Sequence, residues 1–254
     1  MVMNKPKNLF WDMEITGILG WSYDLWESRI HHVERMPTML CFSYWWEDDF
    51  TKSGKRKIKF ESIQFQSEEE LVQKLWNLFD EADYVTAFNG NSFDNKWAVS
   101  KFQDYKMLPP SPYKQIDPFR MSKAVARRPS HSLQNLSEAH GNKGKAKETH
   151  KELWHDCMDG DPLAWKKMKI YNDQDVNALA DEYYIQRPWS KSHPNFGDFA
   201  QVDGVCPKCG SDVRPYGSAP RRGGRVKTYI CNSEQCGARS NEATLKGNGR
   251  LVSA

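Results

Sequence analysis

The sequence predicts an α/β protein with a mixed sheet flanked by helices, followed by a small C-terminal module. Three observations predict this organisation. Strand-like segments come first, and helical and strand-like segments then alternate, an order typical of α/β domains. Ten Trp residues and an aromatic content of 13% supply large side chains for a sizeable core. Four of the six cysteines gather near the C-terminus, outside the α/β part.

The first half of the α/β part is predicted to open with antiparallel strands. Strand-forming residues predominate in residues 7–15, 38–46 and 58–65. Ser53-Gly54 is a turn signal between the last two, which favours a hairpin-like connection. Ser67 to Glu70 form a capping box before an amphipathic run, so a helix is expected there. That helix leads to a further strand over residues 84–88.

The second half is predicted to be mainly helical. A helix is expected from Asp94 to about Tyr105, and residues 115–119 indicate a short edge strand whose pairing ends at Pro118. Residues 132–141 predict a short helix closed by a glycine. Asp161 and Pro162 suit the N-cap and first position of a long helix.

Two acidic residues stand near the end of the first predicted strand. The run Asn8-Leu9-Phe10-Trp11 is apolar after its first residue and leads into Asp12 and Glu14. Residues i and i+2 of a strand lie on one face, so both carboxylates point the same way. Two close negative charges repel each other unless a cation neutralises them, and hard oxygen ligands suit magnesium or manganese. The alternative is an exposed strand face with ordinary acids.

A third acid, Asp94, lies at the transition from a strand to a helix. It follows the turn-forming residues Asn89-Gly90-Asn91-Ser92, which themselves follow a β-rich run. A carboxylate at this position can cap the helix N-terminus, or it can extend from the end of the sheet to a metal. The sequence leaves both roles open.

A fourth acid, Asp175, lies on the long predicted helix, four residues after Tyr171. This spacing stacks the two side chains on one helix face, so a phenol could stand beside a metal-bound water while the carboxylate holds the ion. The alternative is an aromatic core contact next to a solvated acid.

Taken in order, these motifs resemble the three exonuclease motifs of the DEDD superfamily, which has a ribonuclease H-like fold. The motifs are Asp12-x-Glu14, Asn89-x-x-x-Phe93-Asp94 and Tyr171-x-x-x-Asp175. The resemblance covers roughly residues 7–187. One branch of that superfamily has a histidine five residues before the last aspartate, and the other has a tyrosine four residues before it. Ile170 and Tyr171 occupy these positions, so the chain is similar to the tyrosine branch, which includes proofreading domains of polymerases.

The resemblance implies a 3′–5′ exonuclease that hydrolyses terminal phosphodiesters by a two-metal mechanism. The implied ligands of two Mg²⁺ or Mn²⁺ ions, about 4 Å apart, are Asp12, Glu14, Asp94 and Asp175. Tyr171 would orient the attacking water, because a free tyrosine has a pKa of about 10 and is a poor base alone.

Three further residues are expected to contact nucleic acid. Thr16 follows the first motif as in the family pattern, and Asn89 belongs to the second. Phe93 is a candidate for stacking against the last bases of a strand, with core packing as the alternative.

The clustered cysteines form two pairs, Cys206 with Cys209 and Cys231 with Cys236, separated by 21 residues. This spacing resembles a zinc ribbon, in which two turns each donate two thiolates to one structural Zn²⁺. The second pair is wider than in the commonest form. Free thiols or disulfides are the alternatives, and a cytoplasmic setting disfavours disulfides. Cys41 and Cys157 are expected to be separate buried or surface thiols.

The formal net charge of +3 hides an uneven distribution of charge. From Val205 onward there are nine Lys or Arg and three Asp or Glu, whereas the rest of the chain is slightly acidic. The basic residues of the predicted hairpin, which indicate phosphate binding, are Arg221, Arg222, Arg225 and Lys227. A basic hairpin that is merely solvated is the alternative.

The chain is expected to comprise an exonuclease domain over residues 1–187, a linker over 188–204, a zinc ribbon over 205–245 and a flexible tail over 246–254. The predicted substrate is DNA with 3′ ends, preferably single-stranded or frayed, in replication or repair. An exoribonuclease and a non-catalytic nucleic-acid-binding or scaffold protein are the alternatives. Replication or repair proteins are possible partners of the ribbon. No apolar run of membrane-spanning length and no secretory signal are found, so a cytoplasmic location is expected.

Overall fold

The computed structural model describes residues 6–24, 26, 29–144, 152–200, 204–221, 224–242 and 251–253. Its larger part is built on a five-stranded mixed sheet with the strand order β5-β4-β1-β6-β7. These strands are β1 (Asn8–Ile15), β4 (Met39–Trp46), β5 (Lys59–Ser62), β6 (Tyr84–Thr86) and β7 (Lys114–Ile116). The central strand β1 pairs antiparallel with β4 and parallel with β6. The predicted antiparallel opening and α/β class are confirmed.

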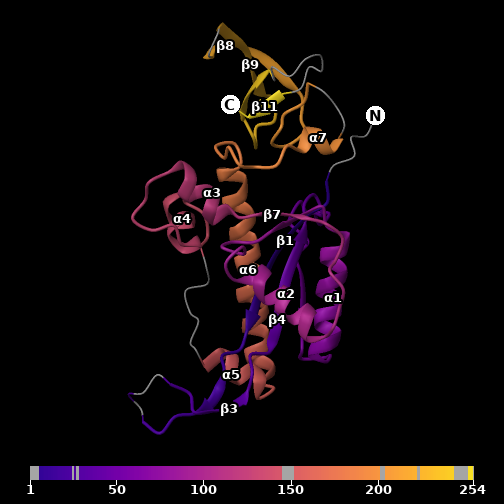
Figure 1. The fold of residues 1–254 in the computed structure, drawn as a ribbon, viewed down its shortest axis with the longest axis vertical. Coiled ribbons are helices and arrows are strands. Elements are labelled where there is room, and N and C mark those ends of the chain that lie inside the picture. The colour runs from indigo at the N-terminus through magenta and orange to yellow at the C-terminus, as the bar shows by residue number, and fades with distance from the viewer. Residues whose placement is uncertain are drawn as a thin grey trace.

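Alternation along β1 divides its side chains between the two faces of the sheet. Leu9, Trp11 and Met13 belong to the core beneath α1 (Glu68–Glu81) and α2 (Asp94–Asp104). Phe10 packs instead with Tyr183 of α6 (Pro162–Gln186) on the opposite face. Because the side-chain period of a strand is two, Asp12 and Glu14 share the face of Phe10 and point toward α6. Figure 1 shows α6 running along this side of the sheet.

The predicted helix signals correspond to caps in the structure. Ser67 and Glu70 form the reciprocal capping box at the start of α1, which satisfies amide groups that would otherwise lack partners. The Asp161 side chain accepts a hydrogen bond from the amide of Leu163 at 2.8 Å and caps α6, with Pro162 as its first residue. Ser132 caps α4 (Leu133–Ala139) in the same way.

The predicted strand over residues 115–119 is wrong in its second half. β7 ends at Ile116, and Pro118 begins the helix α3 (Pro118–Val125). Asp117 is the N-cap, because its carboxylate accepts a hydrogen bond from the amide of Phe119 at 3.1 Å. Proline suits the first turn of a helix since the missing N–H has no partner there in any case. A short helix α5 (Glu152–Met158) also precedes α6.

A two-stranded hairpin projects from the end of β1. It consists of β2 (Leu19–Trp21) and β3 (His32–Arg35), which pair with each other and with no other described strand. Two hydrogen bonds close its base, from the amide of Thr16 to the Thr38 carbonyl at 2.9 Å and from the amide of Thr38 to Oγ1 of Thr16 at 2.8 Å. In Figure 1 the hairpin lies at the end of the molecule away from the C-terminal sheet.

The C-terminal sheet is separate and antiparallel, with the order β11-β10-β9-β8. Its strands are β8 (Val213–Arg221), β9 (Gly224–Cys231), β10 (Arg239–Glu242) and β11 (Leu251–Ser253). The tail predicted to be flexible thus contributes the edge strand β11, which pairs with β10.

The segment predicted as a linker, residues 188–204, contains packed structure. It includes the short helix α7 (Phe196–Ala200), and the buried ring of Phe196 lies 4.9 Å from that of Tyr84. The Phe196 amide also donates a hydrogen bond to the Pro207 carbonyl at 2.8 Å. Composition alone indicated a tether, but contacts such as the hydrogen bond between the Tyr183 hydroxyl and Nε2 of His193 at 3.0 Å pack this segment against the body.

Candidate active site

Three of the four predicted acids converge between β1 and α6. Asp12 and Glu14 project from β1, and Asp175 projects from α6 with only 1% of its surface exposed. One carboxylate oxygen from each residue lies within 4.8 Å of the other two. Three carboxylates at this spacing form a strongly electronegative site made of hard oxygen donors, which suits a divalent cation such as magnesium or manganese. We refer to Asp12, Glu14 and Asp175 as the acid cluster.

The acid cluster is joined to α6 by an amide that the sequence analysis missed. Asn172 is completely buried, and its Nδ2 donates a hydrogen bond to Oδ2 of Asp12 at 2.7 Å. A donor held against a carboxylate fixes the orientation of its oxygens. The spacing contained a signal for this residue, because Asn172 and Asp175 are three apart and therefore share a helix face.

Tyr171 makes an aromatic contact, one of the two roles that the sequence left open, and its place beside a metal-bound water stays a prediction. Its ring makes an edge-on contact with Trp154 of α5, with 6.0 Å between ring centroids. It remains partly exposed, and it lies one helical turn before Asp175. The aromatic contact therefore holds the ring in position without burying it completely.

Asp94 is a buried carboxylate at the start of α2, with 5% of its surface exposed. The cap interpretation is wrong, because Phe93 occupies the N-cap position and Asp94 is the first helical residue. Asp94 does not belong to the set of oxygens that lie within 4.8 Å of one another. The role of Asp94 as a metal ligand stays a prediction.

The turn before Asp94 is tightly constrained. Asn89 has a φ of 58°, and a Cβ added at Gly90 would lie 2.4 Å from the Cβ of Ala87. At the start of α2, Asn95 accepts a hydrogen bond from Nε1 of Trp11 at 3.3 Å. This bond fixes the helix start to β1 at the residue next to Asp12.

The predicted nucleic-acid contacts near the acid cluster lie in different settings. Thr16 is 4% exposed, and its hydroxyl oxygen is used at the base of the β2–β3 hairpin. Asn89 is partly buried, and its amide donates to Oδ1 of Asp117 at 2.9 Å. Phe93 is 46% exposed and contacts Trp97 at 6.5 Å between centroids. Of the three, only Phe93 presents a substantial open surface, and a substrate contact by any of them stays a prediction.

The four C-terminal cysteines form one cluster in which all four sulfur atoms lie within 4.8 Å of one another. Sγ of Cys206 lies 3.8 Å from Sγ of Cys236, and Sγ of Cys209 lies 3.5 Å from Sγ of Cys231. Thiolates about 2.3 Å from a tetrahedral zinc lie about 3.8 Å from one another. The cluster is therefore compatible with a structural zinc site.

Cys41 and Cys157 lie apart from that cluster, as predicted, and both are buried. Burial raises the pKa of Cys157 to about 12, and the nearby charges of Asp156 and Asp161 act in the same direction. Burial also raises the pKa of Cys41, as does the charge of Glu14, its pairing partner on β1. Both side chains are therefore neutral thiols, without the thiolate character of a reactive cysteine.

The basic residues predicted on the C-terminal hairpin are exposed where they are described. Arg221 lies at the end of β8, and Arg225 and Lys227 lie on β9. The Arg225 guanidinium bonds back to Ser218, at 2.7 Å to its hydroxyl and 2.8 Å to its carbonyl. Arg222 lies outside the described residues.

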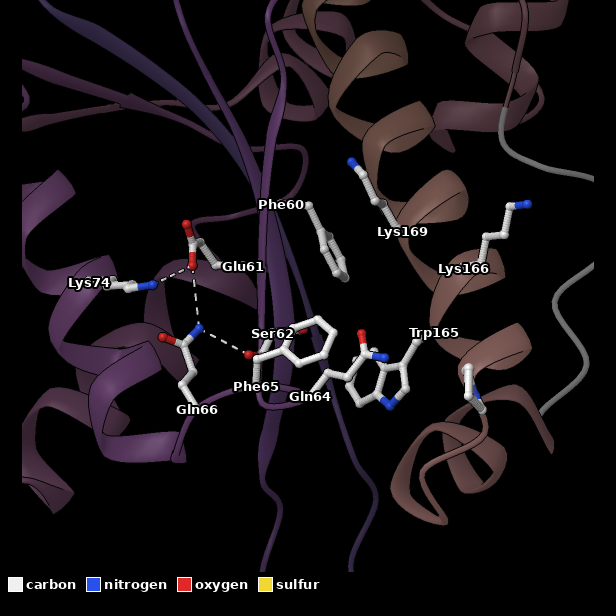
Figure 2. Close-up of a pocket in the computed structure, with 11 residues that line it drawn as sticks. Phe60, Glu61, Ser62, Gln64, Phe65, Gln66, Lys74, Trp165, Lys166 and Lys169 are labelled. Carbon is white, nitrogen blue, oxygen red and sulfur yellow. Dashed lines mark hydrogen bonds and ion pairs between the residues drawn. The ribbon is translucent and has the colours of Figure 1, made fainter.

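A groove of about 540 Å³ lies between β5, α1 and α6, and none of its lining residues belongs to the acid cluster. Figure 2 shows the aromatic side chains of Phe60, Phe65 and Trp165 around it. Two of its lysines are already paired, Lys74 with Glu61 at 2.7 Å and Lys169 with Asp173 at 2.5 Å. The groove is therefore a feature separate from the candidate active site.

Comparisons with known proteins agree with this architecture. The family model of the RNase H superfamily matches residues 33–183. Among solved structures, the family B DNA polymerase from the hyperthermophilic archaeon Pyrobaculum calidifontis is similar at 11% sequence identity and a TM-score of 0.51. The alignment covers 78% of this chain and 27% of the polymerase chain, so the chain spans about a quarter of the polymerase's length. No curated protein matches the sequence.

Within the described residues, no helix combines the length and apolar character needed to cross a membrane. The matched region contains most of the five-stranded sheet and nearly all of α6, including Asp175. The mixed sheet, the helices on its two faces and the family match together assign this chain to the RNase H superfamily.

Proposed function

We propose that the chain is a metal-dependent 3′–5′ exonuclease of the tyrosine branch of the DEDD superfamily. The observation that carries this proposal is the acid cluster, in which side chains more than 160 residues apart bring oxygens within 4.8 Å of one another. A protein that had kept the fold only for binding would not need three repelling carboxylates in one place. Membership of the RNase H superfamily supports an enzyme that acts on nucleic acid.

The acid cluster suits divalent cations by the chemistry of its donors. Asp12, Glu14 and Asp175 would hold the ions, with Asp94 contributing directly or through water. When bound, a pair of such ions supplies an activated water and stabilises the departing 3′ oxygen. Asn172 orients Asp12 from the protein side through its 2.7 Å hydrogen bond.

Tyr171 acts in this proposal as an orienting residue. Its phenol is anchored by Trp154 and lies on the same helix as Asp175. A free tyrosine has a pKa of about 10, so at neutral pH the phenol is protonated and can donate a hydrogen bond to the attacking water.

DNA is the proposed substrate. The similar polymerase is a DNA polymerase, and the tyrosine branch includes polymerase proofreaders. The proposed preference is for single-stranded or frayed 3′ ends, because the terminal phosphodiester must reach the acid cluster without its partner strand. Replication and repair are the processes that this activity suits.

The C-terminal sheet is proposed to be a zinc ribbon that holds the substrate. Sulfur separations of 3.5 and 3.8 Å support one zinc bound by Cys206, Cys209, Cys231 and Cys236. The exposed Arg221, Arg225 and Lys227 support phosphate contacts on the hairpin. Deleting residues 205–254 is expected to weaken affinity for a DNA strand at moderate salt, and unchanged affinity would favour a protein-docking role instead.

The proposal is tested with labelled single-stranded DNA and RNA, each with a free or blocked 3′ end, with and without magnesium or manganese. We expect mononucleotides to be released from DNA with a free 3′ end, only when metal is present. Asp175→Ala is expected to abolish this release. Release of mononucleotides from the blocked strands would contradict the 3′–5′ direction, and an active Asp175→Ala protein would contradict the site. Faster release from RNA would favour an exoribonuclease, and binding without release would favour a non-catalytic role.

A further inference from the structure

The β2–β3 hairpin presents large aromatic rings to solvent. We call this hairpin, with the described residues between its strands, the aromatic arm. Trp21 is 65% exposed, Tyr23 is 90% exposed and Trp26 is 93% exposed. Such rings contribute to stability when they are buried, and grouped exposed apolar surface usually marks a binding site. The aromatic arm is therefore a candidate binding surface outside the acid cluster.

The aromatic arm leads directly out of the candidate active site. Asp12 and Glu14 lie in the last four residues of β1, and β2 begins four residues after Ile15. The two hydrogen bonds between Thr16 and Thr38 fix the base of the arm to the sheet. In Figure 1, β3 and α5, the helix that carries Trp154, both lie at the end of the molecule away from the C-terminal sheet. A nucleic-acid strand that extended from the acid cluster toward this end of the molecule would therefore reach the arm.

The exposed rings have polar neighbours in the arm. Nε1 of Trp21 donates a hydrogen bond to Glu34 at 2.6 Å, and the ring of Tyr23 lies 4.9 Å from that of His31. The amide of Trp26 donates to Oδ1 of Asp24 at 2.9 Å, which closes a turn beneath that residue. These contacts limit the movement of the rings of Trp21 and Tyr23 and of the backbone at Trp26, and they leave most of the ring surface open. Flat ligands with polar edges, such as nucleobases, match this pattern, because every base has a π face and stacks on aromatic rings without sequence preference.

We propose that the aromatic arm is a stacking platform for the bases of a single-stranded nucleic acid whose 3′ end lies at the acid cluster. This inference rests on the proposed function and adds a substrate contact to it. A strand rises about 3.3 Å per residue, so the seven residues from Glu14 to Trp21 span at most ~23 Å. Stacked nucleotides are about 3.4 Å apart, so Trp21 meets a base no more than about seven nucleotides from the cleaved end, and Trp26, five residues farther along the chain, meets one no more than about twelve nucleotides from it.

Because the arm begins beyond the end of β1 and not at the acid cluster, a short strand held at the cluster is expected to miss the rings, which gives the proposal a length-dependent test. Affinity for 5′-labelled oligo(dT) of 3 and 16 nucleotides is measured by fluorescence anisotropy, in an Asp175→Asn background that keeps the strands intact. Stacking of one base on one ring contributes about 1–3 kcal/mol, or about 5- to 150-fold in affinity. Trp21→Ala combined with Trp26→Ala is expected to weaken binding of the 16-mer at least tenfold and binding of the 3-mer less than twofold.

The matched control is Phe65→Ala, which removes an aromatic ring that is 87% exposed at the groove of Figure 2. It is expected to bind both strands like the parent protein. Because the arm residues are exposed, the arm variant and the parent protein are expected to have the same Tm. The Tm is measured on the same samples, so that a large drop caused by misfolding is detected.

Three results would overturn the proposal. The first is that the arm variant binds the 16-mer as tightly as the parent does. The second is that the arm variant loses the same factor in affinity for the 3-mer as for the 16-mer. A change in oligomeric state with unchanged oligonucleotide affinity would assign the rings to a protein contact instead. The proposed function is judged separately, by whether the parent chain without Asp175→Asn hydrolyses a one-nucleotide substrate, the p-nitrophenyl ester of thymidine 5′-monophosphate, when magnesium is added.

Discussion

Asn172→Leu tests the most specific contact in the candidate active site. The substitution keeps most of the side-chain volume and removes the Nδ2 donor that lies 2.7 Å from Oδ2 of Asp12. A hydrogen bond to a charged group contributes about 1.5–3 kcal/mol, and loss of a residue that orients a metal ligand lowers metal affinity or activity about 10- to 100-fold. We therefore expect the magnesium concentration that gives half-maximal nuclease rate to rise about 10- to 100-fold.

The assay is a magnesium titration of mononucleotide release from single-stranded DNA. Asn177→Leu is the matched control, because Asn177 lies on the same helix and bonds to the Asp173 carbonyl at 3.1 Å and to Arg56, away from the acid cluster. It is expected to titrate like the parent protein. If Asn172→Leu also titrates like the parent while remaining folded, Asn172 does not orient a metal ligand.

Two further predictions concern the C-terminal part and its junction with α6. Metal analysis is expected to find one zinc per chain, and Cys236→Ser is expected to lose it. The control Cys157→Ser is expected to retain the zinc, because the Cys157 thiol is buried away from the cluster. Retention of zinc by Cys236→Ser would exclude the site. Burial lowers the pKa of His193 to about 3, whereas its unfolded value is about 6.5, so the unfolded chain binds a proton that the folded chain does not. Stability is therefore lost as the pH falls from about 6.5 toward 3, by about 2 kcal/mol at pH 5. Urea unfolding at pH 7 and pH 5 should show a correspondingly smaller loss for His193→Gln, and equal losses would contradict this assignment.

Much of the α/β body was predictable because local signals and packing agree there. The alternation along β1 separates the apolar residues beneath α1 and α2 from Phe10, Asp12 and Glu14, which face α6. The capping box at Ser67 and the Asp161-Pro162 start of α6 are short-range signals that tertiary contacts do not override. Strand period and the helix cap at Asp161 therefore located β1 and α6, the two elements that carry the acid cluster.

The missed features depend on contacts that local patterns do not contain. Asp117 and Pro118 fit a strand end as well as a helix start, and the hydrogen bond to Phe119 decides between them. The contribution of Asn172 depends on β1 lying opposite one face of α6, which spacing along α6 alone does not specify. Composition counts every Trp toward the core, but Trp21 and Trp26 are exposed on a projecting arm. Composition does not distinguish these two positions from buried ones.

The central claim is that Asp12, Glu14 and Asp175 hold divalent cations at one site. Anomalous diffraction from crystals grown with manganese and a short DNA strand tests it most directly. The acid cluster predicts manganese peaks at about 2.0–2.3 Å from oxygens of all three residues, with the 3′ end of the strand beside them. Manganese peaks elsewhere only, or carboxylates turned away from one another with no ion between them, would contradict the account.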